Sequence, residues 1–97
     1  MDDNQIQPPP SFLALFASPS GHRLLQPIAV VRERYELCED LAQALTEQAA
    51  TVQFKTGAPE QDVLESIGSG LTGDGGALSA EEAGWVKRRL AELLGWA

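Results

Sequence analysis

The longest helical pattern in the sequence is Pro27-Ile-Ala-Val-Val-Arg-Glu-Arg-Tyr-Glu-Leu-Cys-Glu-Asp-Leu-Ala-Gln-Ala-Leu-Thr-Glu-Gln-Ala-Ala-Thr-Val-Gln-Phe-Lys-Thr-Gly57. Its apolar residues recur at steps of three and four, the spacing of one face of an α-helix. This apolar stripe consists of Val31, Tyr35, Cys38, Leu41, Leu45, Ala49 and Val52. Pro27 suits the first turn of a helix, where its missing N–H is not needed, and Gly57 is a natural stop. The sequence therefore predicts one long helix of about 40 Å.

One shorter helix is predicted before this long helix and one after it. Upstream, Ser11 can cap a short helix over residues 12–16, which the turn residues 18–21 (Ser-Pro-Ser-Gly) bring to an end. Downstream, a helix begins near Pro59 and is weakened toward its end by glycines at 68 and 70. Residues 70–78 are therefore expected to form a loop.

A last helix has the clearest start and stop signals in the chain. Residues 79–82 (Ser-Ala-Glu-Glu) match a capping box, and Gly95 is placed to end the helix. No segment alternates as a strand would over more than a few residues. The predicted fold class is all-α: a small helical bundle of three main helices plus a short N-terminal helix.

Length and charge bound the domain organisation and the classes of partner. A chain of 97 residues makes one domain, which we place at residues 11–97, after a flexible Pro-rich lead at residues 1–10. The net charge is −7, and the one dense basic cluster, residues 87–89, lies among glutamates. This disfavours nucleic acids and anionic membranes as partners. One cysteine, no signal peptide at the Met1 start and no long apolar run predict a cytoplasmic protein.

The sequence carries no pattern that predicts catalysis, a cofactor or a metal ion. Gly68 and Gly73 have the spacing of a phosphate-binding loop, but Asp74 stands where that motif needs lysine, and a carboxylate there repels phosphate. His22 is the single histidine and Cys38 the single cysteine, too few for a zinc site and without a marked catalytic partner. We expect a protein that is not an enzyme.

Four aromatic and aliphatic residues near the chain ends are the candidates for binding a protein partner. Phe12, Leu15 and Phe16 belong to a short amphipathic segment that closes the protein's own core or enters a partner's groove. We favour a role in the protein's own core, because a domain this small needs the buried area. Trp96 lies just beyond Gly95, where it is either a binding hot spot or the hydrophobic contact of a helix end. The sequence favours neither of these two hypotheses for Trp96 over the other.

Three stretches also resemble a known family. They are Pro9-Pro-Ser-Phe-Leu-Ala-Leu-Phe16, Arg34-Tyr-Glu-Leu-Cys-Glu-Asp-Leu-Ala42 and Glu82-Ala-Gly-Trp-Val-Lys-Arg-Arg-Leu-Ala-Glu-Leu-Leu-Gly-Trp96. The chain is similar over most of its length to a family of short, uncharacterised proteobacterial proteins that are often labelled "ATPase with chaperone activity". Because this sequence has no Walker A lysine and is too short for an ATPase domain, the resemblance implies association with a chaperone ATPase rather than hydrolysis. It transfers no catalytic residues.

These observations favour a non-enzymatic protein-interaction module: a small adaptor, a regulator or a chaperone-associated subunit. Its partner would be another protein, either a chaperone ATPase or a second copy of the chain. Two alternatives remain open. One is the ATP-dependent chaperone-type activity that the family label suggests, and the other is a structural homo-oligomer.

Overall fold

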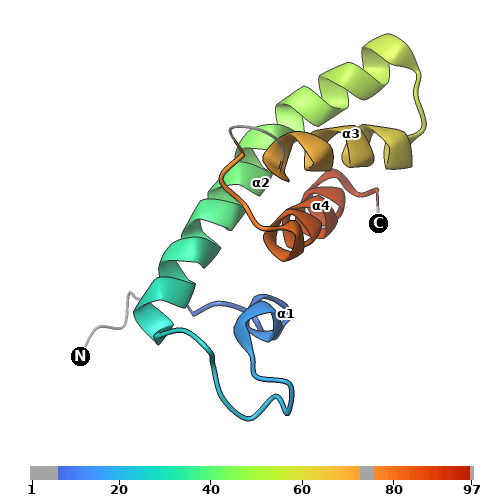
Figure 1. The fold of residues 1–97 in the computed structure, drawn as a ribbon. Helices are drawn as coiled ribbons and strands as arrows, with labels where there is room; N and C mark the ends of the chain where they lie inside the picture. The colour runs from blue at the N-terminus through green and yellow to red at the C-terminus, as the bar shows by residue number, and fades with distance from the viewer. Residues whose placement is uncertain (1–6, 73–75, 97) are drawn as a thin grey trace. The chain divides into compact units, whose positions relative to one another are not determined.

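The computed structural model describes residues 7–72 and 76–96, and helices account for most of them (Figure 1). The elements in chain order are α1 (Pro10–Leu13), the 3-10 helix η1 (Ala14–Phe16), α2 (Ile28–Thr56), α3 (Glu60–Thr72) and α4 (Ala80–Leu94). The described residues contain no strand, only one isolated bridge between Ala17 and Leu24. The predicted all-α bundle of one short N-terminal helix and three main helices is confirmed.

The chain divides into two compact units, residues 1–37 and residues 38–97, with the boundary inside α2. The single domain at residues 11–97 stays a prediction, and of the expected flexible lead, residues 1–6 lie outside the described residues.

The long predicted helix is confirmed as α2, which has 29 residues. At its start, the N–H groups of Val30 and Val31 donate to the Pro27 carbonyl over 3.0 and 3.1 Å. At its end, Gly57 has φ +68°, and its N–H donates to the Gln53 carbonyl over 2.9 Å. A left-handed glycine that closes this bond ends a helix because other residues adopt that conformation only with strain.

The first unit begins its helix earlier than predicted. α1 starts at Pro10, and the N–H groups of Phe12 and Leu13 donate to the Pro9 carbonyl over 2.9 and 3.0 Å. The prediction of Ser11 as the cap was wrong because proline fits the first helical position, where its missing N–H and fixed φ cost nothing. The chain then turns through residues 18–23, where Gly21 has φ +78°.

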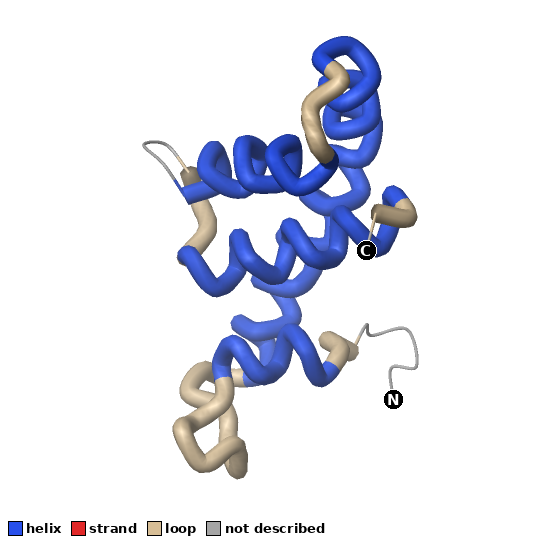
Figure 2. The backbone as a smooth tube through the Cα atoms, turned by 90° about the vertical axis from the view of Figure 1, so that its right-hand side faces the viewer, coloured by secondary structure: helices blue, strands red, loops and turns tan. Residues whose placement is uncertain are grey.

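The second unit is built on α3 and α4, which lie side by side and antiparallel (Figures 1 and 2). Its core contains residues from both helices and from the C-terminal part of α2. The buried members are Ala49, Val63, Leu64, Leu90 and Ala91. Three helices therefore share one hydrophobic cluster, which is how a unit this small buries enough apolar area.

The buried face of α2 differs in detail from the predicted stripe. Val31, Cys38 and Ala49 are fully buried, as a core stripe requires, whereas Val52 is 37% exposed. Ala42 is fully buried beside the half-buried Leu41. Helical periodicity places a stripe only to within one neighbouring position, and the packing of other elements decides which residue is covered.

α3 continues to Thr72, so the prediction of a loop from residue 70 was wrong for its first three residues. Gly68 is buried, and a Cβ atom added there would lie 2.5 Å from the Lys87 Cδ atom of α4. A glycine in a helix costs about 0.5–1 kcal/mol relative to alanine. Glycine at this position leaves room for the Lys87 side chain of the neighbouring helix.

Both predicted ends of α4 are confirmed. The Glu82 N–H donates to Ser79 Oγ over 3.1 Å, and the Ser79 N–H donates to Glu82 Oε1 over 3.0 Å. These two bonds form the capping box. At the other end Gly95 has φ +74°, its N–H donates to the Glu92 carbonyl, and the Trp96 N–H donates to the Ala91 carbonyl. This pair of bonds is a Schellman motif.

Candidate functional site

The N-terminal candidates lie in the first unit and differ in exposure. Phe12 is fully buried, and its ring lies 5.6 Å from that of Phe16 and 5.5 Å from that of Tyr35, measured between centroids. Tilted and edge-on ring pairs at this separation attract one another beyond the area that they bury. Phe12 is thus a core residue, whereas Leu15 and Phe16 are half-buried.

Trp96 lies in the second unit, at the end of α4. Its backbone N–H donates to the Ala91 carbonyl over 2.8 Å as part of the Schellman motif. Its half-buried side chain packs against the hydrophobic cluster of that unit. Trp96 therefore makes the hydrophobic contact of a helix end, which was one of the two hypotheses for this residue. The indole also lines a groove, so part of it remains open to a ligand.

This groove follows the seam between α3 and α4 and has a volume of about 450 Å³. We call it the α3–α4 groove. Three apolar residues, Leu64, Ala91 and Trp96, line it together with Gly84. The other lining residues are polar: Gln61, Lys87, Arg88 and Glu92. The groove therefore combines an apolar part with polar and charged side chains that can orient a ligand.

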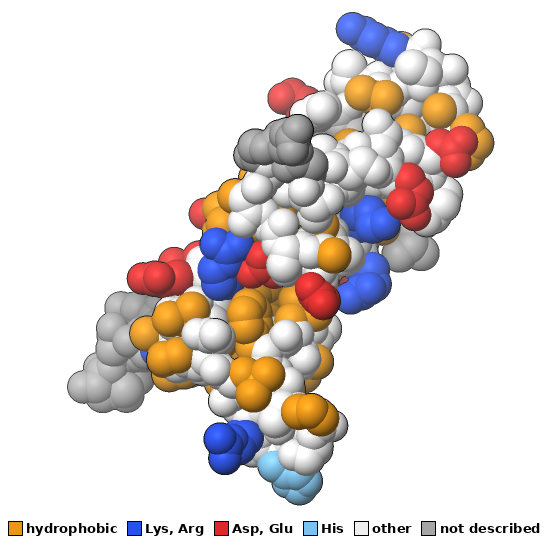
Figure 3. Space-filling model, viewed as in Figure 1, with side chains coloured by type: hydrophobic (Ala, Val, Ile, Leu, Met, Phe, Trp, Pro, Cys, Tyr) orange, Lys and Arg blue, Asp and Glu red, His pale blue; other side chains and the backbone are white. Residues whose placement is uncertain are grey.

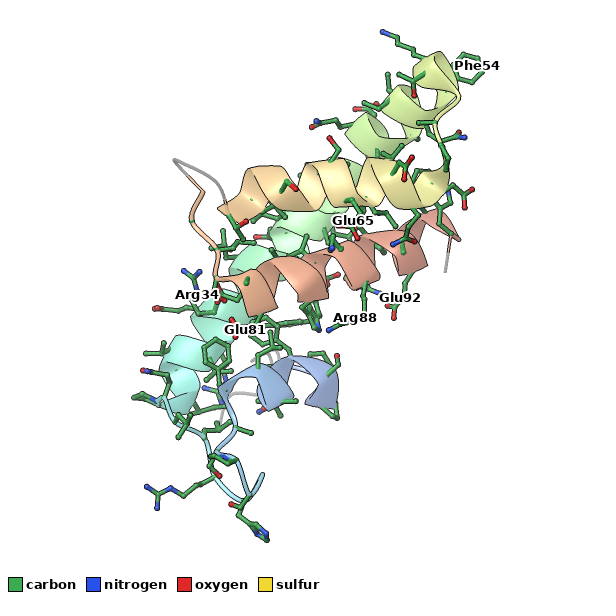
Figure 4. The ribbon with its side chains drawn as sticks, turned by 45° about the vertical axis from the view of Figure 1, so that its right-hand side comes forward. Arg34, Phe54, Glu65, Glu81, Arg88 and Glu92 are labelled. Carbon is green, nitrogen blue, oxygen red and sulfur yellow. The ribbon has the colours of Figure 1, made fainter. Side chains whose placement is uncertain are left out.

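The charged side chains of the α3–α4 groove are unequally paired. Lys87 Nζ lies 3.1 Å from Glu65 Oε1, and the Glu92 carboxylate accepts from Arg89 over 3.2 Å. Among the described residues Arg88 has no ion-pair partner. Arg88 and Glu92 leave α4 on the same side (Figure 4), and acidic and basic side chains are interspersed on the face that α3 and α4 present (Figure 3).

Arg89 forms a bidentate ion pair with Glu39. Its Nε donates to Glu39 Oε1 over 2.9 Å and its Nη2 to Glu39 Oε2 over 3.0 Å, which links α4 to α2. These hydrogen bonds hold the pKa of the Glu39 carboxyl below its ordinary value, against the opposing effect of burial, and the Gln43 amide adds to the lowering. The same contact raises the pKa of the Arg89 guanidinium.

Glu39→Gln is expected to lower the free energy of unfolding at pH 7 by about 1 kcal/mol, because a charge-assisted bidentate pair is lost from a partly exposed site. The folded pKa of Glu39 lies below the unfolded one. Its stabilising contribution is therefore complete above the unfolded pKa and is lost as the pH falls through the folded pKa. Urea titrations of both proteins at pH 7 and in acid measure the difference. A gap that persists undiminished once carboxylates are protonated would contradict this assignment.

Phe54 is an exposed aromatic residue that the sequence prediction missed. Its side chain is 87% exposed and projects from the end of α2 (Figure 4). Phe54 stands two positions after Val52, so it falls on the opposite side of the helix from the apolar stripe. A large apolar residue out of phase with the stripe was the available signal for a surface role.

The residues considered for catalysis are dispersed. His22 is exposed in a loop, and Cys38 is fully buried. Residues Gly68 to Thr72 of the glycine-rich stretch are helical, whereas a phosphate-binding loop offers its N–H groups from a non-helical turn. Residues 73–75 of that stretch lie outside the described part.

Within the described residues, no group of three or more His, Cys, Asp or Glu side chains is arranged to hold a metal ion. None of the described helices combines the length and the apolar character needed to cross a membrane. Comparisons of this chain with protein-family models, with curated proteins and with solved structures find no significant match.

Proposed function

We propose that this chain is a non-enzymatic protein-interaction module that receives a segment of a partner protein in the α3–α4 groove. One observation carries the proposal: an apolar lining, a half-buried indole and the guanidinium of Arg88, without an ion pair in the described part of the chain, meet in one groove. Tryptophan and arginine are enriched among the side chains that contribute most to protein binding.

The size of the groove favours a short segment over a broad interface. Its volume of about 450 Å³ falls in the range of pockets that hold a small ligand or a few side chains. The Schellman motif fixes the backbone at Trp96 and the core cluster supports its side chain, so one wall of the groove is formed before a partner binds. A preformed wall lowers the entropic cost of binding.

The resemblance of three stretches to the family described above supports a chaperone ATPase as the class of partner. An ATP-dependent activity of the chain itself makes a different prediction. Magnesium and ATP at millimolar concentration would then raise the melting temperature, because a ligand bound only by the native state stabilises it. An unchanged melting temperature argues against that alternative.

Self-association is the second candidate function, and Phe54 is the observation that favours it. The Phe54 side chain is 87% exposed, and aromatic residues are enriched at protein–protein interfaces relative to the remaining surface. Sedimentation velocity over a range of concentrations separates a monomeric adaptor from a homo-oligomer.

The proposal is tested by capturing partners on the immobilised full chain from a lysate of the source cell. The wild type is compared with Trp96→Ala and Arg88→Glu, and Lys55→Glu serves as a charge-matched control on an exposed residue outside the groove. All variants must first show wild-type helicity. We expect one protein to be retained by the wild type and by Lys55→Glu and to be lost with both groove variants. Equal capture by all four proteins would reject the groove as the binding site.

A further inference from the structure

We infer that the occupant of the α3–α4 groove is an acidic peptide segment that presents one bulky apolar side chain. This inference rests on the proposed function and adds the chemistry of the partner. It is carried by the charge of the groove, by its apolar lining and by one glycine in its wall.

The charge of the groove is opposite to that of the chain. The chain has a net charge of −7, yet the lining side chains of the groove comprise two cations, Lys87 and Arg88, and one anion, Glu92. Lys87 and Glu92 are each held in an ion pair. The Arg88 guanidinium therefore remains to bind a ligand carboxylate, and such a pair is stronger at the edge of an apolar groove than in open water.

The apolar lining supplies the second half of the recognition. Leu64 and Ala91 are buried members of the core, and Trp96 packs against them. A leucine, phenylalanine or tryptophan side chain of the partner would extend this cluster outward and bury apolar area against it. The groove thus fits a segment in which a carboxylate stands next to a large apolar residue.

Gly84 indicates that the partner's backbone approaches α4 closely. It lies inside α4 and lines the groove, and a Cβ atom added there would meet nothing within 4 Å. Packing within the chain therefore does not require glycine, although glycine weakens the helix relative to alanine. A ligand backbone lying against α4 does require it, since glycine is the residue that permits such an approach.

The same charges disfavour polyanions as the occupant. A nucleic acid or an extended phosphate chain would be repelled by the net charge of −7, because such ligands are bound through several clustered cations. A short peptide with one or two carboxylates meets Arg88 and avoids most of the acidic surface.

The charge preference is tested by selecting random peptides displayed on phage against the immobilised full chain. We expect the selected peptides to combine Asp or Glu with a neighbouring Leu, Phe or Trp. For a synthetic peptide of that sequence, calorimetry should show at least about tenfold weaker binding to Arg88→Glu, as expected for loss of a charge-assisted contact. The same peptide should bind Lys55→Glu as it binds the wild type.

Gly84→Ala separates binding from folding. It should raise the melting temperature by roughly 3–6 °C, as removal of an unneeded helical glycine does, and yet weaken peptide binding at least about tenfold. Gly70→Ala is the matched control: it also lies in a helix with open space at its Cβ position, but it does not line the α3–α4 groove. It should be stabilised to a similar degree and should bind the peptide normally.

The outcomes distinguish the two proposals. Peptides that lose binding with Trp96→Ala but bind Arg88→Glu as they bind the wild type would overturn the acidic partner and leave the groove as a binding site. Selection of basic or uncharged peptides would overturn it too, as would undiminished binding to Gly84→Ala. If the wild type enriches no peptide that depends on a groove residue, both this inference and the proposed function fail.

Discussion

Phe12→Ala is expected to abolish most of the stability of the first unit, at a cost of about 3–5 kcal/mol. Phe12 is fully buried and contacts two other rings, Phe16 and Tyr35, so its truncation removes apolar area and leaves a cavity between them. The amide of Leu13, which donates to the Pro9 carbonyl, reports on the integrity of α1. Its hydrogen-exchange protection measures the free energy of opening in the wild type and the variant.

A matched control for this prediction lies three positions along the chain. Leu15 is half-buried, so Leu15→Ala should cost less than half as much. Phe12→Ala would contradict the prediction by changing the free energy of opening at the Leu13 amide by less than about 1 kcal/mol. Because truncation of a buried aromatic residue costs several times more, that result would show that Phe12 is not the core of this unit.

Leu90→Ala is expected to lower the free energy of unfolding of the second unit by about 2–5 kcal/mol. Leu90 is fully buried in the cluster shared by α2, α3 and α4, and alanine would leave a cavity that helices fixed on several sides fill poorly. Trp85 and Trp96 both lie in this unit, so urea unfolding followed by tryptophan fluorescence reports on it directly.

The control for Leu90 is an apolar residue of the same unit that is less buried. Val52 lies on α2 and is 37% exposed, so Val52→Ala should cost less than about 1 kcal/mol. Equal losses from the two substitutions would show that the three-helix cluster is not where the stability of this unit resides. A loss confined to Leu90→Ala would confirm it.

The end of α2 and both ends of α4 were predictable because the signals that produce them are local. Ser79 and Glu82 bond each other's backbone within one turn, and the left-handed glycines at 57 and 95 end their helices through bonds to the preceding turn. Interactions within a few residues depend little on the remainder of the chain. The start of α1 was missed because two local signals, Pro10 and Ser11, compete, and proline at the first helical position prevails.

The candidate site was predictable only in part. Trp96 was singled out from its position beyond Gly95, and the structure places it in the α3–α4 groove. Nothing in the sequence indicated that Leu64 of α3 would lie beside it, or that Arg89 would bind Glu39 from 50 positions away. Contacts at such separations depend on how the helices pack, which periodicity does not encode.

Local signals and composition were enough to predict the all-α class, the end of α2 and both ends of α4, because caps and turns act within a few residues. Packing between segments instead determines which apolar residues are buried, that the Lys87 side chain lies against Gly68, and that Arg88 has no ion pair among the described residues. Burial and ion pairing depend on contacts between segments that are far apart in the sequence. The sequence of one segment alone therefore does not predict them.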